Sequence, residues 1–159
     1  MTGLLRRTLR SPEQTLALGR VLGGLLRGRD FLALAGPLGA GKTQLIKGIA
    51  AGLGVPEEEP VVSPTFVLIR EYVGRLKLYH LDAYRLQGVA DLAALGVEEM
   101  AAEPDAVVAV EWADRVAQAV PATACWIELE HATVNIRRLR LRWGDGPRLA
   151  TLRDRLPRV

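Results

Sequence analysis

The sequence predicts an α/β fold, a three-layer sandwich in which helices cover both faces of a mixed, largely parallel central sheet with a β-hairpin insertion. Two runs, 30–35 and 106–111, are apolar apart from one terminal acidic residue each, as expected of parallel strands buried on both faces. The first run leads into a glycine-rich loop and then a helical pattern, the order of an α/β unit. At 159 residues the chain is expected to form a single domain, 1–159.

A first helix is expected to begin at Ser11, whose hydroxyl can cap it. Pro12 suits the first turn, and Gln14 is placed to bond back to the cap backbone. Apolar residues at helical spacing then form one face: Leu18, Val21, Leu22, Leu25 and Leu26. After strand 30–35, a second helix is expected from Thr43 until the glycines and proline at 52–56 end it.

The rest of the chain continues the alternation of strands and helices. Two β-rich runs, 67–73 and 75–81, flank Gly74 and predict an antiparallel hairpin. A helix is expected over 89–102, before strand 106–111. The remaining elements are two alternating strands, 125–130 and 136–143, and a short helix over 147–156.

Residues 36–43 read GPLGAGKT, which fits the Walker A pattern of a glycine, four spacers and Gly-Lys-Thr. The backbone N–H groups of such a loop surround phosphates, while Lys42 reaches the terminal phosphates and the Thr43 hydroxyl ligates magnesium. The helix after the loop directs its positive end at the phosphates. A glycine-rich turn that matches by chance is the alternative, but strand, motif and helix together favour a P-loop NTPase-like fold.

Two acidic residues that end predicted strands, Asp82 and Glu111, can complete this site. The carboxyl ends of strands in an α/β domain converge on the ligand crevice, so both carboxylates are expected to face Thr43. There they would hold magnesium and position a water molecule for phosphoryl transfer. The alternative is structural: Asp82 caps the segment after it, and Glu111 pairs with Arg115.

Other polar and aromatic residues are ambiguous from sequence alone. Thr65 or Ser63 could sense the terminal phosphate, or the segment could be only a proline-directed turn. His80 has no second histidine at metal-binding spacing, which favours a structural role or the support of a neighbouring site residue. Trp112 could gate the pocket or meet a partner, although packing at a strand end is the default expectation.

Three arginines share one face of strand 136–143: Arg138, Arg140 and Arg142. This ladder could hold RNA or phosphate. Cross-strand ion pairing with Glu128 and Glu130 explains the arginines without a ligand, and this explanation is favoured.

The composition excludes a membrane protein and a disordered chain. Hydrophobic residues make up 49% and charged residues 25%, and no apolar stretch is long enough to span a bilayer. The start lacks a leader pattern, and Cys125 is the single cysteine, so a cytoplasmic, reducing location is expected. The net charge of +3 is a weak indication of a polyanionic partner.

Four motifs in this order resemble the TsaE (YjeE) family of bacterial ATPases: GPLGAGKT at 36–43, SPTF at 63–66, YHLDAYR at 79–85 and VEWA at 110–113. The resemblance spans nearly the whole chain and implies a single P-loop ATPase domain that uses ATP and Mg²⁺. It also implies a role in the synthesis of threonylcarbamoyladenosine beside the anticodon of tRNA. The implied partners are TsaD, which transfers the threonylcarbamoyl group, and TsaB, with tRNA reached through their complex. ATP binding and hydrolysis would reset that complex between turnovers.

Carried over residue by residue, the resemblance implies catalytic roles for Asp82, Lys42 and Thr65. It implies magnesium ligation by Thr43 and Glu111. Nucleotide binding is implied for the loop, its flank and one C-terminal residue: Gly36, Leu38, Gly39, Ala40, Gly41, Lys42, Thr43, Gln44 and Arg137.

Pro37 departs from the family, which often has an acidic or amide residue there. Proline lacks an N–H group, but this early spacer need not touch phosphate, so binding is expected to survive. For the adenine base, only the segments around Glu13 and Thr15 and at 135–138 loosely resemble family patterns.

Two other function classes stay open. A P-loop small-molecule or nucleotide kinase shares the loop and the size, but neither an acceptor pocket nor a basic lid is identifiable in the sequence. An RNA-binding or assembly module could retain the nucleotide site only as a ligand switch. The favoured expectation is a Mg-dependent ATPase that is slow alone and is modulated by its partners.

Overall fold

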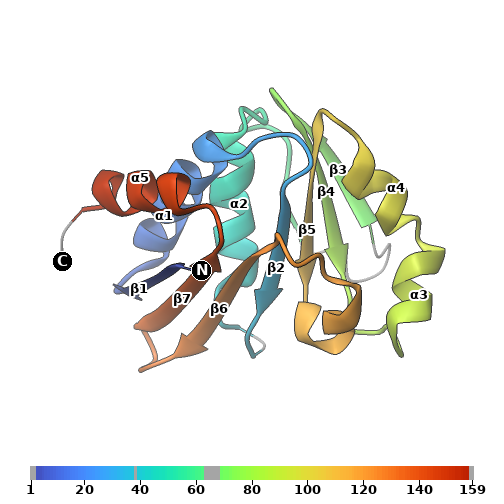
Figure 1. The fold of residues 1–159 in the computed structure, drawn as a ribbon. Helices are drawn as coiled ribbons and strands as arrows, with labels where there is room; N and C mark the ends of the chain where they lie inside the picture. Colours follow the sequence, from blue (N-terminus) through green and yellow to red (C-terminus); the bar gives the residue numbers. More distant parts are fainter. Residues whose placement is uncertain (1–2, 38, 63–68, 158–159) are drawn as a thin grey trace.

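The computed structural model describes residues 3–37, 39–62 and 69–157 of the chain. In this part of the chain, seven strands form one sheet in the order β1-β7-β6-β2-β5-β4-β3 (Figure 1). The strands are β1 Gly3–Leu9, β2 Phe31–Ala35, β3 Ile69–Val73, β4 Lys77–Asp82, β5 Ala106–Glu111, β6 Cys125–His131 and β7 Arg137–Trp143. The helices are α1 Pro12–Leu25, α2 Lys42–Gly52, α3 Val89–Ala94, α4 Val97–Ala102, the 3₁₀ helix η1 Ala113–Ala119 and α5 Gly146–Arg155. None of these helices is long and apolar enough to cross a membrane.

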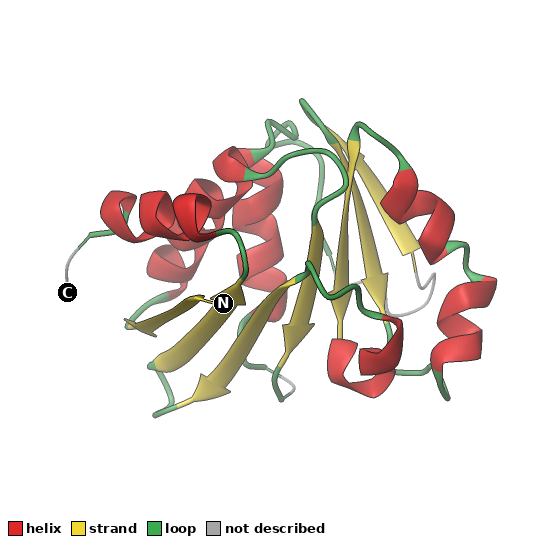
Figure 2. Cartoon of the chain, viewed as in Figure 1, coloured by secondary structure: helices red, strands yellow, loops and turns green. Residues whose placement is uncertain are grey.

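The sheet is mixed, as predicted. Its four central strands, β6, β2, β5 and β4, run parallel, and antiparallel strands close both ends. The predicted hairpin is confirmed as β3 and β4. Helices α1, α2 and α5 cover one face of the sheet, while α3, α4 and η1 lie on the other (Figure 2). These layers confirm the predicted three-layer α/β architecture.

The apolar runs become the centre of two cores. Strand β5 is buried at every position, which explains why its sequence is apolar without alternation. Val107 and Ala109 pack in the core beneath α1 and α2. Val108 and Val110 pack in the core beneath α3, α4 and η1. One strand therefore supports both helical layers.

Three features differ from the sequence-based expectation, one of them being the 3₁₀ helix η1, which was not predicted. Strand β1 was not predicted, because two arginines interrupt its short apolar pattern. Its pairing with β7 stabilises it and buries Leu5 and Leu9. The single helix expected over 89–102 is wrong, since Gly96 adopts a φ of 84° and separates α3 from α4. This left-handed conformation ends a helix, and glycine adopts it without steric cost.

Helices α1 and α2 cross at a point where glycine is needed. A Cβ atom added to Gly19 would lie 2.6 Å from the carbonyl oxygen of Leu45 and 2.8 Å from the Cα atom of Gly48. Both distances are far below a normal van der Waals contact. This close approach fixes the position of α2, which follows the glycine-rich loop.

We expect Gly19→Ala to lower the free energy of unfolding by about 1–3 kcal/mol, because the new methyl group overpacks the crossing. Gly24→Ala is the matched control on the same helix, since a Cβ at Gly24 meets nothing within 4 Å. The control is expected to raise stability by about 0.5 kcal/mol, because alanine favours the helix over glycine. Urea unfolding of both variants measures the difference, and equal effects would contradict the close crossing.

Candidate functional site

Those predicted site residues that the structure describes gather at one edge of the sheet, the lower edge in Figure 1, where the central parallel strands end. Strand β2 ends at Ala35, and the loop after it enters α2 at Lys42. In the parallel register, Leu34 of β2 lies opposite Glu111 of β5, which in turn lies opposite Asp82 of β4. The loop and the two carboxylates therefore share the same edge.

The glycines of the loop are required by its geometry. Gly39 and Gly41 have φ values of 78° and 101°, which residues with a side chain rarely adopt. A Cβ at Gly36 would collide with the carbonyl oxygen of Leu129 in β6, so the loop begins in contact with that strand. Leu38, one of the predicted nucleotide contacts, lies outside the described residues.

Asp82 and Glu111 face the layer that contains α2. Glu111 shares its face of β5 with Val107 and Ala109, and Asp82 shares its face of β4 with Leu78. Those three apolar residues belong to the core beneath α1 and α2. Asp82 is 6% exposed and Glu111 is 3% exposed. Two nearly buried carboxylates thus lie side by side on the face from which α2 begins, as the sequence predicts.

Lys42 lies beside these acids and is buried. Its ammonium group donates a hydrogen bond to the carbonyl oxygen of Gly36. Burial lowers the pKa of Lys42, and the negative charges of Glu111, Asp82 and Asp114 oppose that shift. The cation is therefore held within the loop by its own backbone and by surrounding carboxylates.

Trp112 covers Lys42 at the mouth of the site. The Lys42 ammonium lies 3.6 Å from the centroid of the indole ring, within the range of a cation–π interaction. Trp112 has a φ of 59°, which is uncommon for a residue with a side chain. Its ring also lies 4.9 Å from that of Tyr84, on which the Arg115 guanidinium stacks at 4.9 Å. Trp112 therefore contacts the lysine of the site in addition to packing at the end of β5.

His80 holds Glu111 in place. His80 is fully buried, and its Nε2 lies 2.6 Å from a carboxylate oxygen of Glu111. Because an ionised carboxylate can only accept, Nε2 donates this bond. Among residues 3–37, 39–62 and 69–157, no group bonds to the buried Nδ1 of His80. His80 was expected either to be structural or to support a neighbouring site residue, and its contact with Glu111 agrees with the second of these roles. Among the ion pairs of the described residues, Glu111 pairs with His80 and not with Arg115, so that structural alternative for Glu111 is wrong.

Asp82 performs the capping role that was its structural alternative. One of its carboxylate oxygens accepts a hydrogen bond from the backbone N–H of Tyr84 at 2.8 Å. This bond orients the carboxylate and is compatible with a second role for its other oxygen. Capping and chemistry therefore do not exclude each other at this position.

The residues present fit a magnesium ion that is shared with a phosphate. Mg²⁺ prefers hard oxygen ligands and is usually bound by one or two carboxylates together with substrate phosphates. Thr43 in the first turn of α2, Glu111 and Asp82 supply a hydroxyl and two carboxylates of this kind. No cluster of three His, Cys, Asp or Glu side chains within the described ranges could hold a metal by itself.

A hollow of about 460 Å³ adjoins the loop. This volume falls within the range of small-molecule pockets. Its lining comes from the starts of α1 and α2 and from the turn between β6 and β7: Arg10, Ser11, Pro12, Thr15, Gly41, Gln44, Val134, Asn135 and Arg137. The structure thus brings Gln44 and Arg137 together with the loop.

Arg137 connects the β6–β7 turn to the glycine-rich loop. Its guanidinium donates to the carbonyl oxygens of Val134 at 3.0 Å and Gly39 at 3.4 Å. Arg10 and Ser11 line the hollow but were not predicted as site residues, although the segment around Glu13 and Thr15 loosely resembled a family pattern. Asn135 belongs to the segment 135–138, for which the same loose resemblance was the signal. Thr65 cannot be placed, because it lies outside the described residues.

A family model described as threonylcarbamoyl adenosine biosynthesis protein TsaE matches residues 9–139. The chain belongs to the TsaE family. The match covers the loop, both buried carboxylates and Arg137. It confirms the resemblance that the four sequence motifs indicated.

Named relatives agree with this membership. This TsaE-family chain is 42% identical over 120 residues to the tRNA threonylcarbamoyladenosine biosynthesis protein TsaE of Treponema pallidum, covering 76% of the chain and 87% of the relative. It is 45% identical over 112 residues to the protein of the same name from a Nostoc species, covering 68% and 67%. The crystal structure of Bacillus subtilis YdiB superposes with a TM-score of 0.79 at 32% identity, over 98% of this chain and 95% of YdiB.

The contact between His80 and Glu111 predicts different effects for two amide substitutions. His80→Gln places an amide nitrogen near the position of Nε2 and can still donate to Glu111, whereas His80→Asn is too short. We expect His80→Asn to cost about 1–3 kcal/mol more of the free energy of unfolding, because it leaves a buried carboxylate oxygen without its donor. Urea unfolding measures the stability of both variants. Each variant loses the packing of the imidazole ring, so equal losses of unfolding free energy would show that the hydrogen bond to Glu111 contributes nothing.

Proposed function

We propose that this TsaE-family protein is a Mg-dependent ATPase of tRNA threonylcarbamoyladenosine modification. The observation that carries the proposal is the placement of Asp82 and Glu111 on the face from which α2 begins, beside a Walker A loop whose lysine is already in the site. Fixed positive and polar groups beside two carboxylates are the parts that phosphoryl transfer requires.

Each part of ATP has a matching region. The phosphates would lie against the N–H groups of the loop and the positive end of α2, with Lys42 released from Gly36 to meet them. The ribose and the base would occupy the hollow between α1 and the β6–β7 turn, where Arg137 closes one side. Thr43 and Glu111 would hold the magnesium ion, which neutralises phosphate charge.

Asp82 is the residue we assign to hydrolysis. Its carboxylate lies next to Glu111 and is oriented by the N–H of Tyr84. From there it would accept a hydrogen bond from the attacking water and position it in line with the terminal phosphate. His80 would keep Glu111 from turning toward Lys42, so that metal binding and phosphate binding use separate groups.

The protein would act on TsaD and TsaB in the cytoplasm and reset their complex between turnovers, with tRNA engaged through that complex. Slow hydrolysis alone and a changed rate with partners are expected of such a timing device. A P-loop kinase is the second candidate.

Lys42→Ala is expected to weaken ATP binding about 10- to 100-fold, because it removes a charge-assisted bond to phosphate. Lys47→Ala is the matched control, since Lys47 is exposed on the same helix and its loss changes the net charge equally. Isothermal titration with ATP and magnesium measures both affinities. Unchanged affinity in Lys42→Ala would refute the nucleotide site.

Glu111→Ala and Asp82→Ala are expected to separate metal binding from hydrolysis. Glu111→Ala should abolish the gain in ATP affinity that magnesium brings. Asp82→Ala should keep that gain and lower turnover about 100-fold or more, as the loss of a group that positions or activates water does. Titrations with and without magnesium and a phosphate-release assay provide the readouts. An equal loss of affinity in both variants would contradict this division of roles.

The partner role is tested by copurification of the chain with TsaD and TsaB, with and without ATP. Nucleotide-dependent association and a partner-dependent hydrolysis rate are expected. Transfer of phosphate to an added metabolite would establish the kinase instead. Nucleotide binding without turnover, alone or with partners, would identify a ligand switch rather than an enzyme.

A further inference from the structure

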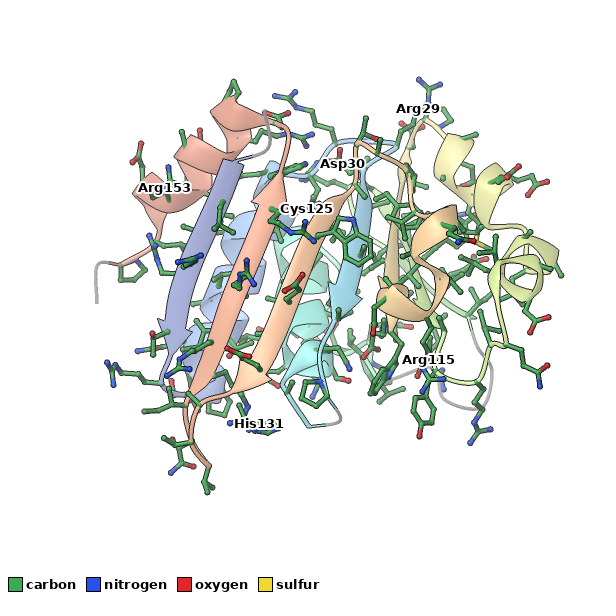
Figure 3. All side chains as sticks on the ribbon, turned by 60° about the horizontal axis from the view of Figure 1, so that its bottom comes forward. Arg29, Asp30, Arg115, Cys125, His131 and Arg153 are labelled. Carbon is green, nitrogen blue, oxygen red and sulfur yellow. The ribbon has the colours of Figure 1, made fainter. Side chains whose placement is uncertain are left out.

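In the part of the chain that the structure describes, one half of the sheet has helices on only one face. Figure 3 shows β1, β7 and β6 in front, with α1 and α2 behind them. On the front, which we call the open face, the three strands present alternate residues in register: Leu4, Arg6 and Thr8 of β1; Arg138, Arg140 and Arg142 of β7; and Trp126, Glu128 and Glu130 of β6. The arginine ladder predicted on β7 is thus extended by β1.

The carboxylates of the open face neutralise only part of its positive charge. Glu128 lies 3.7 Å from Arg140 and 3.3 Å from Arg142, so one carboxylate serves two guanidiniums. This agrees with the ion-pairing explanation for those two arginines. Arg6 and Arg138, in contrast, form no ion pair with any residue that the structure describes.

The position of Arg6 is unfavourable without an anion, whereas Arg138 lies opposite Glu130 of β6. Arg6 lies directly opposite Arg140 in the antiparallel register of β1 and β7. Like charges directly opposite each other destabilise a sheet, typically by a few tenths of a kcal/mol up to about 1 kcal/mol. A bound anion between the two strands would remove this repulsion.

A hollow of about 430 Å³ lies at these positions. Four arginines line it, Arg6, Arg7, Arg138 and Arg140, together with Thr8 and a single carboxylate, Glu130. Arg7 is oriented by its bonds to the backbone carbonyl oxygens of Arg6 and Arg153.

A second hollow of about 380 Å³ shares Arg138, Arg140 and Glu130 and extends to Gly36 and Pro37 of the glycine-rich loop. This second hollow is also lined by Asp114 and Glu128, so the excess of arginine lies in the first hollow, which adjoins the second through Arg138 and Arg140. A ligand on this surface would lie close to the loop without occupying it.

We propose that the open face binds the phosphodiester backbone of tRNA, with Arg6 and Arg138 as its main contacts. The proposal rests on the proposed role in tRNA modification and adds a direct RNA contact to it. Guanidinium groups bind phosphate oxygens in pairs of parallel hydrogen bonds, and an excess of arginine over carboxylate provides the electrostatic attraction. Such contacts position an RNA without reading its sequence.

An acidic protein surface is a poorer match for this face. Protein interfaces depend on a buried apolar or aromatic centre, whereas here only Leu4 and Trp126 are apolar, and both lie at one end of the face. Arg142 lies 5.9 Å from the ring of Trp126, so that ring is not an open platform for base stacking either. A surface that is rich in arginine and has no apolar centre fits the phosphate groups of an RNA backbone better than it fits a protein.

The test is the double variant Arg6→Ala/Arg138→Ala, measured for binding of an unmodified tRNA transcript by fluorescence anisotropy over a range of KCl concentrations. We expect the affinity to fall about tenfold or more and the slope of log Kd against log salt to decrease by about 2, one for each lost phosphate contact. Arg20→Ala/Arg70→Ala is the matched control. Both control arginines are exposed, neither lines the two hollows, and their loss changes the net charge equally.

The outcomes separate this proposal from its alternatives. Equal weakening in the control variant would show that general charge, not the open face, attracts RNA, and an absence of tRNA binding by the unaltered protein would overturn the proposal. Displacement of tRNA by polyglutamate at equal charge would assign the face to an acidic protein.

The ATP affinity of the Arg6→Ala/Arg138→Ala variant is measured in parallel and should stay unchanged. If the unaltered protein binds tRNA but does not bind ATP, the proposed ATPase function is refuted and the proposed RNA contact is not.

Discussion

The parallel pairing of β2 with β5 on one side and β6 on the other is the constraint on which the site depends. It brings the loop after β2 between Glu111, which ends β5, and the turn that carries Arg137 after β6. A shift of one residue in the β2–β5 register would turn Glu111 away from α2, because neighbouring strand positions face opposite layers. Apolar side chains on both faces of these strands maintain the register, so packing far from the loop determines its chemistry.

The site concentrates charge where water is largely excluded. Lys42, Asp82 and Glu111 are each 6% exposed or less, and each has a bond that holds it: to Gly36, to the N–H of Tyr84 and to His80. Asp82 and Glu111, oriented in this way, do not need to reorganise when a charged ligand arrives, whereas Lys42 would exchange its bond to Gly36 for one to the ligand. The sequence motifs indicate this arrangement, and the fold brings its residues together. Both agree with the membership of the chain in the TsaE family.

Much of the fold and the site could be predicted from the sequence, because their signals are local. Continuous apolar runs identified β2 and β5, the spacing of glycines, lysine and threonine identified the loop, and the terminal acids of two strands identified Asp82 and Glu111. The rest depends on contacts between distant segments. Strand β1 exists because β7 pairs with it, and Arg10, Ser11 and Asn135 meet only when α1 and the β6–β7 turn fold against the loop. The partner of Glu111 could not be found from chain proximity, since His80 lies on the neighbouring strand β4, 31 residues earlier in the chain.

The glycine crossing of α1 and α2 has a mechanical consequence. Two helices that pack backbone against backbone cannot slide or rotate past each other without steric overlap, so they move as one body. The start of α1 lines the hollow and the start of α2 continues the loop, so one wall of the candidate nucleotide site belongs to this body, while the β6–β7 turn and Arg137 form the other. A change of shape between nucleotide states is therefore expected outside this body, where the β6–β7 turn with Arg137 lines the hollow and where Trp112 and Tyr84 lie beside Lys42.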